Sequence, residues 1–136
     1  MAKGQDRFQE RKNRVASFGR ELVRRSGSRC ELCSASGVRL EVFEVAPVPE
    51  EPDIEGCVML CETCRDQVET PNRRDPDHWR CLDNSIWSET RAVKVLSVML
   101  LRSNAVPEGR AHDLLEQVYL DPDEEEWIEH GLRSFQ

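Results

Sequence analysis

The sequence lacks the features that define several protein classes. It contains no run of 18 apolar residues, so no membrane span is expected, and no apolar segment near its start resembles a secretory signal. A glycine-rich phosphate loop, an H-E-x-x-H helix and a Ser-His-Asp arrangement are also missing. Because neither a membrane span nor a secretory signal is expected, we expect a cytoplasmic protein. The missing catalytic and phosphate-binding motifs argue against an enzyme without excluding one.

Charge is distributed unevenly along the 136 residues. The formal net charge of −7 argues against a general nucleic-acid binder, yet residues 1–33 carry nine Lys and Arg against four Asp and Glu. This basic arm could contact nucleic-acid phosphates or an acidic partner through Arg14, Arg20, Arg24 and Arg25. The alternative is that these arginines form only the solvated face of a helix. Between the two kinds of partner, we favour a protein over a nucleic acid.

Four of the six cysteines form two C-x-x-C pairs. Cys30 and Cys33 are separated from Cys61 and Cys64 by 27 residues. Each pair forms a tight turn that directs two sulfurs at one ion, so together the pairs predict a tetrahedral zinc site. Disulfides, a redox C-x-x-C and inert thiols are the alternatives. Because the protein would fill every ligand position, we expect one structural Zn²⁺ that performs no chemistry.

The surroundings of the predicted site can also be read from the sequence. Four thiolates around Zn²⁺ leave about two negative charges, and Arg29 and Arg65, each next to a ligand, are placed to offset them. The remaining cysteines, Cys57 and Cys81, lie in apolar surroundings and are predicted to be small buried hydrophobes. His78 could orient a ligand or act as an acid or base, but a structural role is the favoured interpretation.

The first half of the chain is predicted to contain a helix, a hairpin and a second helix. An apolar stripe over residues 6–25 indicates a helix that ends at Gly27. Residues 38–45 and 57–60 are predicted strands, and residues 62–69 a short helix after them. The stripe of the first helix consists of Phe8, Val15, Phe18 and Leu22.

The second half is predicted to be helical after a polar linker at residues 70–77. Residues 92–101 are apolar on nearly every side, which is typical of a helix in the middle of a core. Asp121 is the predicted N-cap of the last helix. Inner faces are expected to be formed by Trp79, Leu82, Ile86, Ala111, Leu114, Leu115, Val118, Tyr119, Trp127, Ile128 and Leu132, with Trp79 and Trp87 at the seam between the two halves.

These elements together predict an α+β fold, in which a small treble-clef or zinc-ribbon hairpin module packs on a mostly α-helical bundle. We expect a single domain over residues 1–136. Its parts are a basic amphipathic helix at residues 1–27, the four-cysteine module at residues 28–70 and a helical part at residues 78–133.

The cysteine framework resembles that of the zinc-framed HNH nucleases. Their pattern has a catalytic histidine before a proline in the first strand, an asparagine ahead of the second strand and a histidine after the last cysteine. In this chain Phe43 and Glu44 stand where the first histidine would fall, Gly56 where the asparagine would be, and Arg65 after the final cysteine. The resemblance implies a similar scaffold without the catalytic residues.

A more extensive resemblance covers roughly residues 20–130. It rests on the stretches RSGSRCELC (25–33), VFEVAP (42–47), VMLCETC (58–64), HWRCLDNSIWSE (78–89) and DLLEQVYLD (113–121). Together these stretches resemble the zinc-ribbon region of the longer proteobacterial PhnA-type proteins, which are named after phosphonate-utilisation operons. Those proteins continue into a small β-barrel that has no counterpart in these 136 residues. The resemblance implies zinc binding and no established enzymatic activity.

Three functional hypotheses follow from the sequence. The first is a non-catalytic, zinc-binding interaction module with a protein partner. The second is an enzyme, either a hydrolase linked to phosphonate metabolism or a degenerate HNH-type nuclease. The third is a nucleic-acid binder that uses the basic first helix.

Overall fold

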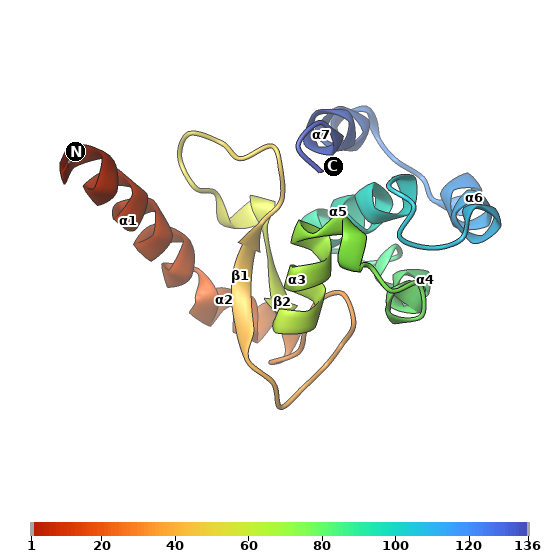
Figure 1. The fold of residues 1–136 in the computed structure, drawn as a ribbon, viewed down its shortest axis with the longest axis horizontal. Helices are drawn as coiled ribbons and strands as arrows, with labels where there is room; N and C mark the ends of the chain where they lie inside the picture. The colour runs from red at the N-terminus through yellow and green to blue at the C-terminus, as the bar shows by residue number, and fades with distance from the viewer. Residues whose placement is uncertain (1, 136) are drawn as a thin grey trace.

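Two helices precede the sheet in the computed structural model, which describes residues 2–135, with side chains from residue 6 to residue 135 (Figure 1). Helix α1 (Ala2–Ser17) and helix α2 (Gly19–Ser26) replace the single helix predicted over residues 6–25. The break lies next to Gly19, because glycine has a low helix propensity. Gly27 ends α2 in the left-handed conformation, with φ of 65°, as predicted.

The sheet is a two-stranded antiparallel hairpin. Strand β1 (Leu40–Glu44) pairs with strand β2 (Cys57–Cys61), and Phe43 lies opposite Val58. Every residue of β2 is buried, whereas every residue of β1 is partly exposed. The connecting loop ends in a short 3-10 helix, η1 (Ile54–Gly56). Both predicted strands are therefore present, although the first begins two residues later than predicted.

Helix α3 (Glu62–Glu69) follows β2 without a loop, and residues 70–77 then cross to the helical part as an ordered segment. This segment contains the 3-10 helix η2 (Pro71–Arg73). Arg74 donates hydrogen bonds to the carbonyl oxygens of Gln67 and Val68, both at 2.9 Å, and its guanidinium lies 4.9 Å from the centre of the Phe135 ring. The predicted linker is thus held against both halves of the chain.

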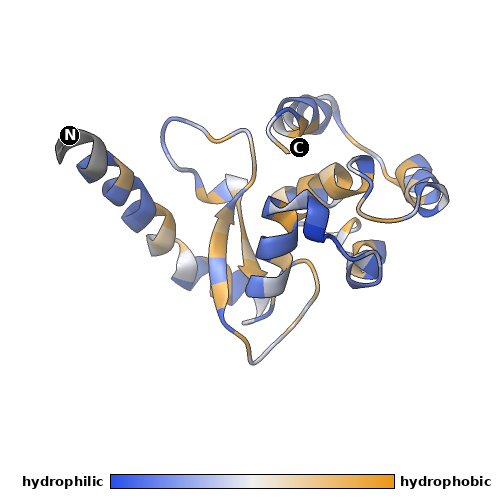
Figure 2. Ribbon diagram, viewed as in Figure 1, coloured by the Kyte–Doolittle hydropathy of each residue, from blue (hydrophilic) through white to orange (hydrophobic). Residues whose placement is uncertain are grey.

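The helical part is arranged around helix α5 (Arg91–Arg102), which contains nine buried residues and lies between the hairpin and the other C-terminal helices (Figures 1 and 2). One core cluster extends from Leu32 and Leu60 in the cysteine-bearing half to Leu96 in α5. The prediction that residues 92–101 occupy the middle of the core is confirmed. Around α5 lie the 3-10 helix η3 (His78–Cys81) and the helices α4 (Leu82–Ser85), α6 (Glu108–Gln117) and α7 (Pro122–Leu132).

Helix α7 begins as the sequence predicts. The Asp121 carboxylate accepts the Glu124 backbone N–H at 2.8 Å, and the Glu124 carboxylate accepts the Asp121 N–H at 3.0 Å, which forms a capping box. Arg91 and Lys94 of α5 donate to the same two carboxylates at 2.7 and 3.0 Å. The N-terminus of α7 is therefore attached to α5 by charged hydrogen bonds.

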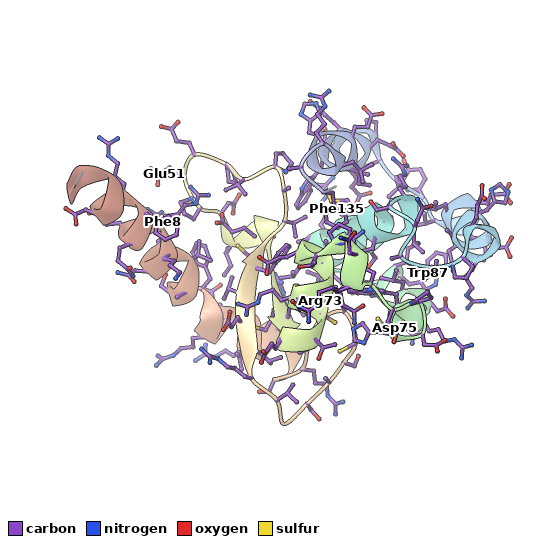
Figure 3. All side chains as sticks on the ribbon, viewed as in Figure 1. Phe8, Glu51, Arg73, Asp75, Trp87 and Phe135 are labelled. Carbon is purple, nitrogen blue, oxygen red and sulfur yellow. The ribbon has the colours of Figure 1, made fainter. Side chains whose placement is uncertain are left out.

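Three large side chains that were predicted to face inward are exposed instead. Phe8 is 65% exposed because its part of α1 extends beyond the hairpin, and Tyr119 is 75% exposed because α6 has already ended at Gln117. Trp87 is 49% exposed and lies beside α4, away from the hairpin (Figure 3), whereas Trp79 is fully buried. Only Trp79 can therefore serve as the predicted aromatic seam. None of the described helices has the length and apolar character needed to cross a membrane.

Candidate metal centre

The four cysteines of the two C-x-x-C pairs come together between the hairpin and α3. Cys30 and Cys33 lie in a tight turn after α2, in which the Cys30 N–H donates to Ala35 O and the Ser34 N–H donates to Cys30 O, both at 2.9 Å. Cys61 is the last residue of β2 and the N-cap of α3, and Cys64 lies in the first turn of that helix. Each pair is therefore shaped by local backbone geometry.

The sulfur atoms are close enough to share one ion. All four Sγ atoms lie within 4.8 Å of one another, and Cys33 Sγ is 3.6 Å from Cys61 Sγ. A tetrahedral zinc site with Zn–S bonds of about 2.3 Å has sulfur–sulfur edges of about 3.8 Å. Cys33 is half-buried and the other three cysteines are buried. This group could therefore hold a metal ion, and it is the one such group found among the described residues.

Electrostatics around the sulfurs favour the charged form of one thiol, that of Cys30, over those of Cys33 and Cys64. A hydrogen bond from Cys64 lowers the pKa of Cys30 to about 4, and the same hydrogen bond raises the pKa of Cys64. Burial raises the pKa of Cys33 to about 11. The Cys64 N–H donates to Cys61 Sγ at 3.4 Å, so the N-terminus of α3 presents a positive dipole end to the sulfurs. A bound cation would favour the thiolate form of all four.

His78 contacts the site, as in the ligand-orienting role that the sequence left as an alternative to a purely structural one. Its Nε2 lies 3.1 Å from Cys64 Sγ, within hydrogen-bond distance, and its ring packs edge-on against Trp79 at 4.9 Å. The signal in the sequence was the DHWRC stretch, in which a histidine precedes a buried tryptophan.

The arginines expected to offset the thiolate charge do not do so. Arg65 forms ion pairs with Glu41 and Glu69, and Arg29 is exposed. These arginines are adjacent to ligands in sequence, but their side chains extend to other partners or to solvent. Among the described contacts, His78 is the nitrogen-bearing side chain within hydrogen-bond distance of a ligand sulfur.

The two remaining cysteines differ from each other. Cys57 is fully buried, its Sγ donates to Asp53 O at 3.3 Å, and burial raises its pKa to about 11. The prediction of a small buried hydrophobe is confirmed for this residue. Cys81 is half-buried, and its pKa is raised to about 12, first by burial and then by the nearby charges of Cys33 and Cys30. Cys81 thus lies beside the metal centre, outside the group of four.

The positions where an HNH nuclease would carry its catalytic residues serve other purposes here. The Glu44 carboxylate accepts two hydrogen bonds from Arg11, at 2.7 and 3.2 Å. The Phe43 side chain packs against the core, and Gly56 is part of η1. The catalytic histidines and asparagine of an HNH nuclease thus have no counterpart at residues 43, 44, 56 and 65.

The basic arm is partly neutralised within the chain. Arg14 pairs with Glu51 at 3.2 Å, and Arg25 pairs with Glu31 at 2.7 Å and donates to Cys57 O at 2.9 Å. Arg20 and Arg24 are exposed. Two of the four arginines that were predicted to contact nucleic acid are thus already paired with carboxylates of the same chain.

Comparison with known proteins identifies no relative, since no protein-family model, no curated protein and no solved structure matches this chain.

Proposed function

We propose that the chain is a non-catalytic interaction module built around one structural Zn²⁺ held by Cys30, Cys33, Cys61 and Cys64. The observation that carries the proposal is the cluster of four Sγ atoms within 4.8 Å of one another. An all-sulfur tetrahedral set suits zinc, and it leaves no open position for water or substrate. When bound, the ion would supply a fixed positive charge that crosslinks the turn after α2 to the start of α3.

The arrangement of the four ligands supports a treble-clef assignment. One pair lies in a turn before a β-hairpin, and the other pair lies at the N-terminus of the helix that follows the hairpin. The cysteine-bearing stretches also resemble the zinc-ribbon region of PhnA-type proteins, which supports zinc binding without supplying a reaction. The engaged side chains of Glu44 and Arg65 weigh against a nuclease.

A protein partner is better supported than a nucleic acid. The net charge is −7, and two of the four arginines predicted to contact nucleic acid, Arg14 and Arg25, are paired with carboxylates of the same chain. Phosphate contacts would require these ion pairs to break. Exposed Arg20 and Arg24 leave a nucleic-acid role to be tested by the salt dependence of any binding.

Elemental analysis of the purified chain tests the metal assignment. We expect one equivalent of zinc, its loss in Cys61→Ser, and its retention in the matched control Cys57→Ser, because Cys57 lies outside the group of four. Less than about half an equivalent, with no other metal in its place, would contradict the assignment.

Incubation of the zinc-loaded chain with DNA and Mg²⁺, Mn²⁺ or Ni²⁺ tests whether the chain has nuclease activity. We expect no cleavage. Cleavage that disappears in Glu44→Ala would assign a catalytic role to that carboxylate, and cleavage that survives would locate a nuclease site elsewhere. Either result would refute the non-catalytic assignment.

A further inference from the structure

The backbone of β1 has an open edge. Because the Val45 N–H donates to Gly56 O at 2.9 Å and the register pairs Phe43 with Val58, the backbone groups of Glu41, Phe43 and Val45 face β2. Alternation along the strand then directs the N–H and C=O groups of Leu40, Val42 and Glu44 away from β2. These outward groups form a short row of donors and acceptors.

The opposite edge of the hairpin is covered by the chain itself. The outward N–H of Met59 donates to the Glu31 carboxylate, and the outward C=O of Met59 accepts the Glu31 N–H, both at 2.8 Å. Arg25 donates to the outward carbonyl of Cys57 at 2.9 Å. By contrast, the outward N–H groups of Val42 and Glu44 donate to no described group, that is, to no backbone of residues 2–135 and no side chain of residues 6–135. The outer edge of β2 is therefore hydrogen-bonded to other parts of the chain, whereas the outer edge of β1 keeps unpaired N–H groups.

A groove of about 720 Å³ runs along the open edge, and all five residues of β1 line it. Helix α1 lines the groove with the apolar side chains of Phe8 and Val15 and with Arg11 and Lys12, and helix α3 lines it with Arg65 and Glu69. Phe8 is 65% exposed and lies on the part of α1 away from α2 (Figure 3). The groove thus combines an unpaired backbone edge with a mixed apolar and basic side at α1 and a charged side at α3.

We infer that this groove binds an extended segment of a partner protein, which adds a strand to β1. A five-residue strand spans about 17 Å, and its backbone would satisfy the outward groups of Leu40, Val42 and Glu44. A bound helix would leave those groups unpaired. The inference rests on the proposed interaction function and names the surface that performs it.

The walls determine the sequence pattern of the segment. Successive side chains of a strand alternate between faces, so one set would face α1 and the other would lie beside Arg65 of α3. Three of the four cations that line the groove are paired with carboxylates of the groove, which leaves Lys12 as the cation without an ion pair among the described side chains. We therefore expect apolar residues at every second position, with one acidic residue placed to reach Lys12. The cations are Arg11, Lys12, Arg39 and Arg65, and the carboxylates are Glu41, Glu44 and Glu69.

Panning of the zinc-loaded chain against a displayed library of random heptapeptides tests the inference. We expect enriched peptides to carry apolar residues at alternate positions together with an acidic residue, and a labelled synthetic copy to bind as measured by fluorescence polarisation. N-methylation at one set of alternate positions should weaken binding at least tenfold, because those N–H groups face β1, while methylation of the other set should have little effect. Equal effects of the two methylated sets, or no enrichment, would overturn the inference.

Substitution of the strand provides a matched test. Val42→Pro removes an outward N–H without removing a bond to β2, whereas Val42→Ala shortens the side chain and keeps the N–H. We expect the proline variant alone to lose peptide binding. If Val42→Pro fails to fold, as judged by its zinc content and far-ultraviolet circular dichroism, the methylated peptides decide the question on the native chain.

Two further outcomes separate this inference from the proposed function. One equivalent of zinc together with failure of all peptide binding would contradict the assignment of the groove as a binding site and would leave the metal assignment intact. Concentration-dependent self-association that Val42→Pro abolishes would show that the groove binds a second copy of this chain, which would overturn the assignment to a partner protein.

Discussion

Replacement of Gly131 by alanine should destabilise the protein, although alanine is the better helix former. Gly131 is buried in α7, and a Cβ atom there would lie 2.5 Å from Ala46 O and would overlap Met99 Cε. The methionine side chain can move, but Ala46 O is backbone and also accepts the Trp127 Nε1–H at 3.0 Å. Overpacking costs about 1–3 kcal/mol, and the rigid backbone contact places this site near the upper end. After a gain of about 1 kcal/mol in helix propensity, the expected net loss is about 2 kcal/mol.

Gly109 in α6 provides the matched control. It is exposed, and a Cβ atom there would meet no heavy atom within 4 Å. Gly109→Ala should therefore raise the free energy of unfolding by up to about 1 kcal/mol. Urea denaturation of the zinc-loaded variants, followed by circular dichroism, measures both values. If Gly131→Ala is as stable as Gly109→Ala, the close packing of α7 on the loop after β1 is wrong.

Three other predictions concern the cysteines and their surroundings. Stripping zinc under mild denaturant should shift tryptophan fluorescence and remove helical circular dichroism together, because the core cluster joins Leu32 to Leu96; persistence of the helix signal would mean two independent units. Cys57 should resist alkylation at pH 8, because burial raises its pKa from 9.0 to about 11. Its contribution to the free energy of unfolding should be complete below pH 9 and should be lost as the pH rises through 11. In Cys57→Ala this pH-dependent loss should be absent. His78→Ala should weaken zinc binding about tenfold or more in a chelator competition, and unchanged affinity would show that its contact with Cys64 does not act on the metal centre.

The features that the sequence predicted correctly depend on local chemistry. The first C-x-x-C pair lies in a tight turn, the second lies at the start of α3, and the predicted N-cap at Asp121 needs only a backbone N–H three positions later. The central helix α5 was predictable because its own side chains are apolar on nearly every side. This property can be read from the sequence without knowing which elements pack against the helix. Such elements require no knowledge of how distant segments pack.

The features that the sequence left open or predicted wrongly are those where distant segments decide the outcome. His78 reaches Cys64 only because η3 folds back on α3, and Arg65 turns from the neighbouring thiolates to Glu41 on the adjacent strand. The exposure of Phe8 depends on how far α1 extends past the hairpin, which helical periodicity does not state. A hydrophobic stripe shows which residues share a face, but not whether that face is covered.

The hairpin shows how the metal centre and the open edge are related. Glu31 lies between Cys30 and Cys33, and both its backbone and its carboxylate hold Met59. The turn that supplies two ligands therefore also covers the outer edge of β2. Since a two-stranded sheet has only two edges, this arrangement leaves the edge of β1 as the free one, where α1 and α3 form walls without supplying backbone partners. A metal that fixes the turn would thus also fix which edge of the hairpin can receive another strand, which would couple the proposed structural Zn²⁺ to the proposed binding groove.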